Sequence, residues 1–494
     1  MPPGHRPPAA RRTAFARSVL TLASGTAAAQ ALLALALPLL TRLYTPGDYG
    51  ALAVFSSTIT VLLVVASLRY EQAIPLPEGD DDAGSLLALS LALLAGMAAA
   101  VGVLVWLAGD ALVAAANVPA LRGWLWLVPM GFAGAGSYQA LSYWAIRRHA
   151  FDRLARTRVA QGVGQTATQL GLGALGGGAP GLLLGDLVGR VAGGGGLAVL
   201  ALRERPRPRV TRASIAAVAR RYRRFPLLST WAGLFNVGSL QLPSIVFAAG
   251  FGAAAAGLYA LSYKVLVLPT MLVAQAVGQV FLSRAAALAR DPDELRRLTE
   301  RTALALFAAG LPMFGAVGLA GPELFRAVMG AEWETAGRYA QVMSPWFAVW
   351  VVSNPLSGLL SVREWQGSAL AFSAFELALR VGALVLGTRE GSPLLAVALL
   401  SASGVIIAGA SIARFLRAGH SSVARLLGPG ARVLALAALC LLPAALALRA
   451  SRPVLALLVG VPGVGAYYLL VLRMLPGVRL PWAPADAPPR TVSS

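Results

Sequence analysis

The residues of this chain that could do chemistry are charged side chains inside long apolar segments. Lys264 is the only lysine among the 42 Lys and Arg residues, and no acid lies within four positions of it. Because a charge inside a membrane-spanning helix costs about 2.5–3.5 kcal/mol on insertion scales, it normally faces a cavity or a partner. The sequence therefore predicts that Lys264 binds an anionic group of a substrate in a central cavity. The alternative is a lysine whose long side chain extends to the membrane surface.

Two further intramembrane arginines come with acids four residues before them. The pairs are Asp186 with Arg190 and Glu376 with Arg380. An acid at this distance before a base shares one helix face with it, so each pair can form a structural ion pair that lowers the cost of burial. In a second interpretation each acid titrates, and its protonation frees the arginine for substrate. The two acids are thus candidate coupling groups, and the two arginines are candidate substrate-binding groups.

Charged residues also lie at the ends of the first two apolar segments. Arg69 and Glu71 lie at the inner end of the second segment, and residues two apart on a helix do not face each other. Arg69 is a candidate for substrate entry, with an interfacial anchor as the alternative, and Glu71 is a third coupling candidate. Arg42 ends the first segment on the outside, either as an anchor or as a cation on the release side. The acidic stretch 78–82 is expected to be solvated.

Uncharged polar residues inside apolar segments complete the candidate site. Asn236, Gln241 and Gln275 are candidate substrate-binding residues, and Gln30 and Gln279 lie in comparable positions. Sugar hydroxyls would need such a lining, but hydrogen bonds between helices explain polar residues of this kind equally well.

The composition identifies an integral membrane protein. Of the 494 residues, 57% are hydrophobic and 13% are charged, and the mean hydropathy is +0.69. No class of soluble globular protein has so many long uncharged stretches. The net charge of +21 comes from arginines in short loops between these stretches, which argues against a nucleic-acid-binding protein. One cysteine and three scattered histidines form no metal-ligand pattern, and no cofactor is expected.

Hydropathy predicts an all-α protein with about fourteen transmembrane helices. The predicted spans are 18–40, 50–68, 85–108, 124–145, 159–177, 181–201, 226–248, 257–282, 302–320, 339–361, 366–387, 393–413, 431–448 and 453–472. With the N-terminus inside, 32 of the 42 Lys and Arg residues lie in inside segments, seven lie outside and three lie within spans. This asymmetry predicts that both termini are cytoplasmic.

An internal repeat divides the chain. Residues 37–52 resemble residues 242–259, about 207 positions later. Because six spans separate the copies, both have the same orientation, which predicts two parallel six-helix lobes related by an axis along the membrane normal. The predicted domains are an N-lobe (1–202), a basic cytoplasmic linker (203–224), a C-lobe (225–418) and two more spans with a cytoplasmic tail (419–494).

The first predicted hairpin resembles that of a known family. Its sequence, LASGTAAAQALLALALPLLTRLYTPGDYGALAVF followed by SLRYEQAIPLP, is similar to polysaccharide-biosynthesis and O-antigen flippases of the multidrug/oligosaccharidyl-lipid/polysaccharide exporter superfamily. The resemblance covers residues 18–77, with a weaker match near 220–290. It implies a multidrug-exporter-like fold in the bacterial cytoplasmic membrane. It also implies a flippase that moves undecaprenyl-pyrophosphate-linked oligosaccharide, an O-antigen or exopolysaccharide repeat unit, by alternating access, with polysaccharide polymerase and export proteins as candidate partners.

Two other functions are alternatives. A cation-coupled multidrug exporter of the same superfamily would need buried acids to bind organic cations, whereas Lys264, the buried charge without a local partner, is positive. A membrane glycosyltransferase or polymerase would need catalytic groups on large loops, and the longest outside loop is only residues 321–338. No Walker A motif is present, so ATP hydrolysis is not expected. The sequence therefore favours a transporter rather than an enzyme.

Overall fold

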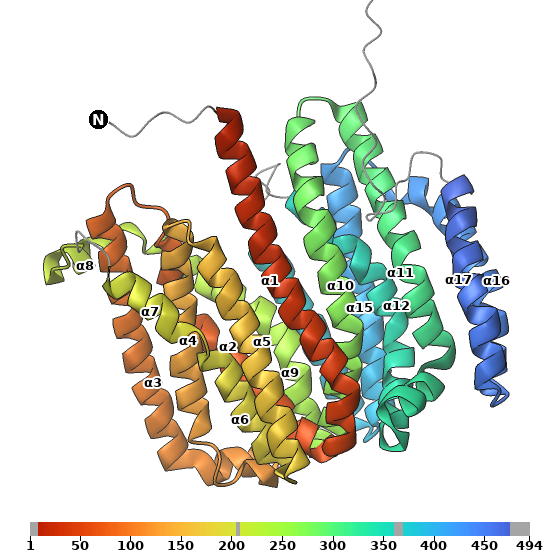
Figure 1. Cartoon of the computed structure of the whole chain (residues 1–494), viewed down its shortest axis with the longest axis horizontal. Coiled ribbons are helices and arrows are strands. Elements are labelled where there is room, and N and C mark those ends of the chain that lie inside the picture. The colour runs from red at the N-terminus through yellow and green to blue at the C-terminus, as the bar shows by residue number, and fades with distance from the viewer. Residues whose placement is uncertain (1–7, 204–207, 360–368, 475–494) are drawn as a thin grey trace, which may run out of the picture. The chain divides into compact units, whose positions relative to one another are not determined.

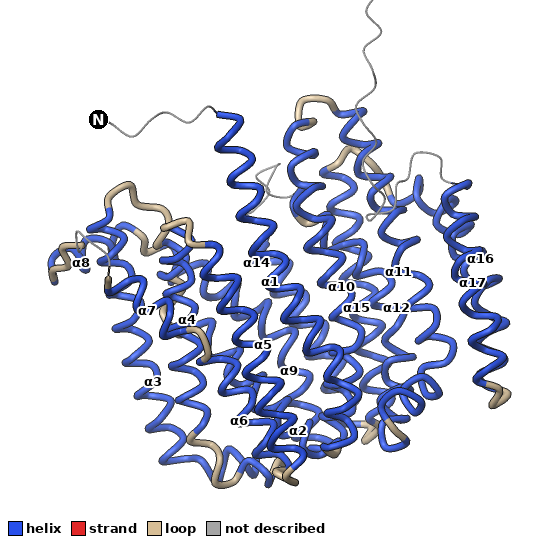
Figure 2. Tube along the Cα trace, viewed as in Figure 1, coloured by secondary structure: helices blue, strands red, loops and turns tan. Residues whose placement is uncertain are grey.

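The computed structural model describes residues 8–203, 208–359 and 369–474. This part of the chain is almost entirely helical and contains no strand (Figure 2). Its α-helices are α1 (Pro8–Leu43), α2 (Pro46–Val65), α3 (Asp80–Ala116), α4 (Leu127–Arg147), α5 (Phe151–Ala174), α6 (Gly178–Val191), α7 (Gly194–Leu202), α8 (Arg212–Arg221), α9 (Thr230–Phe251), α10 (Ala253–Ala287), α11 (Pro292–Met329), α12 (Glu334–Leu356), α14 (Ala369–Arg389), α15 (Pro393–Ala418), α16 (Val423–Arg449) and α17 (Pro453–Met474). Short turns of 3-10 helix are η1 (Tyr70–Ala73), η2 (Pro119–Leu121) and η4 (Ala331–Trp333), and η3 (Phe225–Ser229) is a turn of π-helix.

Each predicted span falls on a helix of the described residues, which confirms the all-α membrane fold. Ten helices in this part of the chain are long and apolar enough to cross a membrane, with α6 and α7 together forming one of them. The other four predicted spans fall on α4, α5, α12 and α17. Helix α5 is too polar for the hydropathy criterion because it carries three arginines and three glutamines. Several of these side chains face a cavity.

The structure divides into two compact units. Unit 1 consists of Met1–Val265, Phe325–Tyr339 and Gly367–Leu400, and unit 2 of Leu266–Leu324, Ala340–Gln366 and Ser401–Ser494. The lobe and linker boundaries inferred from the repeat follow a different criterion, and they stay a prediction.

Small residues allow the helices of unit 1 to pack closely. Helix α1 lies along α5 (Figure 1). A Cβ added at Gly25 would lie 2.9 Å from the Cβ of Ala155, and one added at Gly162 would lie 3.0 Å from the Cβ of Ala29. Such contacts between backbones stabilise helix pairs in lipid, where no hydrophobic effect drives them together.

A polar corner fixes the entry into α2. Thr45 caps this helix: its hydroxyl accepts from the backbone N–H of Asp48, and the Asp48 carboxylate accepts from the backbone N–H of Thr45 at 2.9 Å. Pro46 occupies the first turn, where its missing N–H costs no hydrogen bond. The connection between the first two helices is therefore only two residues long, shorter than the gap between the predicted spans 18–40 and 50–68.

The starts of α2 and α10 cross in a reciprocal contact. A Cβ at Gly50 would overlap the carbonyl oxygen of Ala253, and a Cβ at Gly257 would overlap the carbonyl oxygen of Pro46. The contacts are equivalent in the repeat, because 253 − 46 and 257 − 50 both equal 207. A contact in which i meets j and j meets i is the signature of a two-fold relation. This geometry supports the internal repeat inferred from the sequence.

The last two spans pack within unit 2. Helices α16 and α17 lie against each other and against α11, around a buried apolar cluster that includes Leu311, Ala437 and Val471. The hydroxyl of Tyr467 donates to the carbonyl of Ala308 at 2.9 Å. A buried tyrosine hydroxyl needs such a partner, so this bond fixes α17 on α11.

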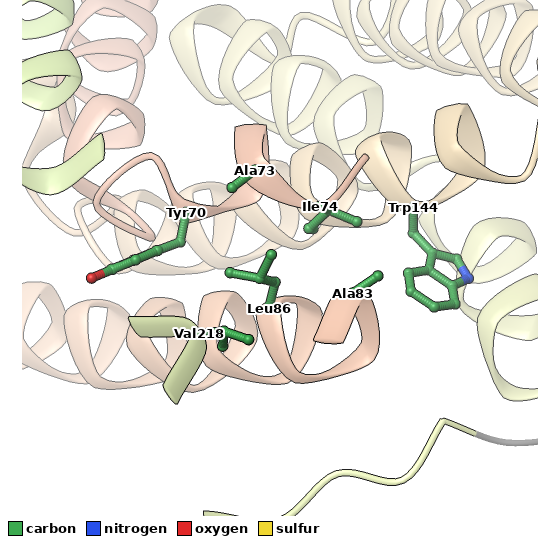
Figure 3. Packing of buried hydrophobic residues seen from close by; sticks show 7 residues of the cluster. All are labelled: Tyr70, Ala73, Ile74, Ala83, Leu86, Trp144 and Val218. Atoms are coloured by element: carbon green, nitrogen blue, oxygen red, sulfur yellow. The ribbon is translucent and has the colours of Figure 1, made fainter. Parts of the chain in front are cut away.

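The predicted linker forms a helix that is docked on unit 1. Val218 of α8 is buried against Leu86 of α3 and Tyr70 of η1 (Figure 3). The tyrosine hydroxyl also donates to the carbonyl of Ala219 at 3.0 Å. Part of the basic linker therefore belongs to the packed core of unit 1.

The acidic stretch at the start of α3 is not simply solvated. Asp80 forms ion pairs with Arg147 at 2.8 Å and with Arg148 at 3.0 Å, and Asp82 pairs with Arg221 at 3.4 Å. The sequence suggested free acids because the partners lie far away in the chain.

Candidate functional site

Unit 1 contains a polar cavity of about 600 Å³, which we call the unit 1 cavity. Helices α1, α2, α4, α5 and α6 form its walls. Its size falls in the range of small-molecule binding sites. Its polar lining consists of Thr26, Gln30, Tyr138, Gln139, Ser142, Tyr143, Arg158, Gln161, Gln165, Asp186 and Arg190.

The predicted ion pair of α6 lies in the wall of this cavity. The carboxylate of Asp186 accepts from Nε of Arg190 at 2.5 Å, and only 12% and 17% of the two side chains are exposed. The guanidinium also lies 3.5 Å from the carbonyl oxygen of Ser56 in α2, to which it donates. The pair therefore links α6 to α2 while it faces the cavity.

Lys264 is half-buried on α10 and lies outside the lining of the unit 1 cavity. The charge of Asp186 on α6 acts on it, although the ion pair of Asp186 is with Arg190.

The second predicted ion pair lies on α14. Glu376 accepts from Arg380 at 3.2 Å, and only 4% of the arginine side chain is exposed. Both charges act on Tyr263, the neighbour of Lys264 on α10. Charged residues of both ion pairs therefore act on neighbouring residues of α10: Glu376 and Arg380 on Tyr263, and Asp186 on Lys264.

Glu71 is 1% exposed and bound to a cavity residue. Its carboxylate accepts from the hydroxyl of Ser67 and from Nε2 of Gln139 at 2.8 Å. The preceding residues, Leu68 and Arg69, have φ values of 51° and 65°. Two successive non-glycine residues in the left-handed region are uncommon and mark a strained elbow. The second span therefore ends at Val65, and the elbow carries Glu71 back under α4.

Arg69 points into the protein rather than to the membrane surface. Its guanidinium packs so closely on α9 that a Cβ at Gly233 would overlap it. Within the described part of the chain, its buried Nε finds no hydrogen-bond partner. Its charge, like that of Glu71, acts on Tyr143 of the cavity lining.

Four other predicted residues lie outside the unit 1 cavity. Arg42 and Asn236 are exposed, and Gln241 accepts from the hydroxyl of Ser57 at 2.9 Å, which is a contact between α9 and α2. The side chain of Gln275 lies outside the described residues. Substrate roles for these four residues stay predictions.

One cavity cation, Arg158, is not among the residues predicted from the sequence. The predicted spans leave it in the inside loop before residue 159, but it belongs to α5, and its guanidinium lies 5.2 Å from the ring centroid of Tyr138. A signal was present, because Arg158, Gln161 and Gln165 follow the spacing of one helix face. That polar stripe lines the cavity.

This lining offers groups that can bind a polar ligand. It offers two guanidinium groups, one carboxylate already paired, four amides and several hydroxyls. Among the described residues, no group of three or more His, Cys, Asp or Glu side chains could hold a metal ion. The best ligand is therefore rich in hydroxyl groups and carries negative charge.

Known structures share this fold at low sequence identity. A lipid II flippase MurJ in an inward closed conformation has a TM-score of 0.69 and 9% identity, covering 94% of this chain and 99% of its own. An inward-facing multidrug resistance MATE family transporter of the MOP superfamily has a TM-score of 0.55 and 14% identity, covering 81% and 95%. A MOP superfamily transporter from Pyrococcus furiosus has a TM-score of 0.53 and 13% identity, covering 82% and 96%.

Sequence comparison identifies the family. No curated protein matches the chain. The family described as polysaccharide biosynthesis protein matches residues 39–337, more than half of the chain, and this match includes the unit 1 cavity helices α2, α4, α5 and α6. The chain is therefore a multi-pass membrane protein that belongs to the polysaccharide biosynthesis protein family.

Proposed function

We propose that this protein is a flippase for undecaprenyl-pyrophosphate-linked oligosaccharide in the cytoplasmic membrane of a bacterium. The observation that carries the proposal is the unit 1 cavity, a chamber lined by amides, hydroxyls and arginines inside a bundle of apolar helices. Membership of the polysaccharide biosynthesis family and a fold similar to a lipid II flippase support it. The O-antigen or exopolysaccharide repeat unit is the proposed cargo.

The cavity can lower the energetic cost of moving a polar headgroup across the membrane. Sugars and a diphosphate cannot cross hydrocarbon without losing their hydration. Amides such as Gln161 and Gln165 replace water at hydroxyl groups, and Arg158 and Arg190 replace it at the phosphates. Lys264, which lies outside the lining of this cavity, is proposed as a further cation for the substrate. The polyprenyl chain stays in the bilayer, and alternating access exposes the headgroup to each side in turn. The side rich in arginines is the proposed cytoplasmic side.

Three acids are proposed to couple transport to a proton or ion gradient. Protonation of Asp186 would free Arg190 for substrate, and protonation of Glu376 would free Arg380 in the same way. Glu71, which accepts from Ser67 and Gln139, is the third proposed coupling group. The protein itself makes or breaks no covalent bond in this scheme. Polysaccharide polymerase and export proteins are the proposed downstream partners.

A multidrug exporter is the second candidate, because the MATE transporter shares the fold. Organic cations require unpaired acids, whereas Asp186 in the cavity wall is already paired with Arg190. This balance of charge favours an anionic cargo.

Loss of the protein tests the proposal. We expect a deletion strain to accumulate a lipid-linked oligosaccharide on the cytoplasmic side of the membrane, measured by extraction and mass spectrometry after inside-out and right-side-out labelling. The wild-type chain should restore export, whereas Arg190→Gln combined with Lys264→Gln should not. Normal lipid-linked oligosaccharide in the deletion strain, or efflux of cationic drugs by the wild-type chain, would contradict the flippase function.

A further inference from the structure

A cluster of exposed arginines lies on the linker helix α8 and in the residues next to it. We call it the arginine collar; its members Arg209, Arg212, Arg220, Arg221, Arg223 and Arg224 are all exposed. The cluster begins just before α8 and ends at Arg224, the residue before the π-helical turn η3.

Unit 1 holds the collar in place through the opposite side of α8. Val218 is buried, and the hydroxyls of Ser85 and Ser214 are 2.9 Å apart. The backbone N–H of Arg209 donates to the Asp81 carboxylate at 2.7 Å. The apolar and hydrogen-bonding side of α8 is thus used within unit 1, and the arginine side is left exposed.

Few acids neutralise these arginines. Asp82 pairs with Arg221, while Asp80 is shared by Arg147 and Arg148. Across the described ranges, the structure shows no ion pair for the other exposed collar arginines, namely Arg209, Arg212, Arg220, Arg223 and Arg224. Several positive charges therefore remain available to an external anion.

The residues after the collar place it at the membrane surface. Leu227, Leu228 and Trp231 follow within about two helical turns and are 62%, 57% and 54% exposed. Large exposed apolar side chains in a membrane protein face the acyl chains, and tryptophan prefers the headgroup boundary. Arg223 and Arg224 lie less than about two turns before these residues, so their side chains reach the depth of lipid phosphates.

From this arrangement we infer that the arginine collar binds anionic phospholipids of the adjacent leaflet. Charge complementarity identifies the occupant, because phospholipid phosphate is the abundant anion at this depth and arginine binds it with a rigid fork of donors. Neutral lipids offer no net charge to the collar. Binding should weaken as salt rises, because the exposed charges are screened. This inference does not depend on the flippase function.

Lipid titration of the purified full-length protein tests the inference. The probes are phosphatidylglycerol and phosphatidylcholine with identical acyl chains, and the readouts are the midpoint of thermal unfolding and the lipid retained in native mass spectrometry. The collar variant is Arg220→Gln/Arg223→Gln/Arg224→Gln. Its control, Arg389→Gln/Arg449→Gln/Arg452→Gln, loses the same charge from exposed arginines in predicted outside segments.

Phosphatidylglycerol should stabilise the wild-type protein and the control more than phosphatidylcholine does. The collar variant should bind phosphatidylglycerol on the order of 100-fold more weakly at low salt, given about 1 kcal/mol per arginine. Equal responses of the collar variant and its control would overturn the inference. If the collar variant does not fold, the salt dependence of the wild-type protein provides the test. A phosphatidylglycerol preference of the wild-type protein that persists in 1 M salt would contradict the proposal. A collar-dependent response to geranylgeranyl diphosphate, without one to phosphatidylglycerol, would also overturn it.

Discussion

Asp186 is a mostly buried carboxylate in the wall of the unit 1 cavity. It accepts from Arg190, and its charge acts on Lys264. Removing one partner of a buried ion pair typically costs about 3–5 kcal/mol, because the remaining charge is left in a low-dielectric environment. We expect Asp186→Asn to lower the free energy of unfolding by about this amount, measured by thermal unfolding of the purified protein.

A double-mutant cycle separates this effect from a local packing defect. Asp186→Asn with Arg190→Met should be less destabilised than the sum of the single variants, because the second change removes the uncompensated guanidinium. Additive effects would contradict an energetically coupled pair.

Of the two cavity arginines, Arg158 forms no ion pair with a carboxylate among the described residues. It stacks on Tyr138, which shares a hydrogen bond of 2.8 Å with the hydroxyl of Thr157. Loss of a charged hydrogen bond is worth about 1.5–3 kcal/mol. We therefore expect Arg158→Gln to weaken headgroup binding about 10- to 100-fold, measured as exported glycan at limiting expression.

Two further variants serve as comparisons for Arg158→Gln. Arg158→Lys keeps the charge but loses the planar stacking, so it should restore only part of the export. Arg153→Gln removes an exposed arginine of the same helix outside the cavity lining and should export normally. Equal export by Arg158→Gln and Arg153→Gln would exclude a substrate role for Arg158.

Helices α5 and α6 form the cavity wall because glycines allow them to approach. A Cβ at Gly185 would overlap the side chain of Gln169 and lie 3.1 Å from the carbonyl oxygen of Gln165. Gln169 is 2% exposed, and its side-chain amide donates to the carbonyl of Leu182 at 3.2 Å, so this side chain cannot move away easily.

Alanine scanning of two glycines tests this packing. Gly185→Ala should lower the free energy of unfolding by about 1–3 kcal/mol through overpacking. Gly171→Ala, at a position of α5 with open space around it, should raise that free energy by about 0.5–1 kcal/mol through better helix propensity. Stability changes of the same sign in both variants would show that Gly185 does not set the helix spacing.

Periodicity and hydropathy predict elements well and contacts between elements poorly. The hairpin 18–77 and the pair Asp186–Arg190 depend on neighbours in the chain, and both are present in the structure. The interaction of Lys264 with Asp186 joins helices far apart in the sequence, and no local pattern contains it. Arg158 was missed for a different reason: the predicted span began at residue 159, whereas α5 begins at Phe151, so the residues before 159 were counted as loop although Arg158 lines the cavity.

At the scale of the molecule, the internal repeat and the reciprocal glycine contact both bear on how the two predicted lobes would move during alternating access. The starts of α2 and α10 touch backbone to backbone, where Gly50 meets Ala253 and Gly257 meets Pro46. If the two lobes rock against each other to open one side of the membrane at a time, this crossing must separate in the state that opens on its side. A methyl group on either glycine would therefore disfavour the present conformation relative to the open one.

Cysteine labelling tests this population shift. Ser57 is 3% exposed and binds Gln241 across the α2–α9 contact, so a Ser57→Cys reporter in a Cys440→Ser background should be labelled slowly. Adding Gly50→Ala or Gly257→Ala should accelerate labelling several-fold, and by similar factors, because the two contacts are equivalent in the repeat. Gly47→Ala is the control: the nearest atom to its Cβ would be the Thr45 hydroxyl oxygen at 3.6 Å. Acceleration by only one of the two glycine variants would contradict a two-fold crossing, and acceleration by Gly47→Ala would indicate general loosening of the turn.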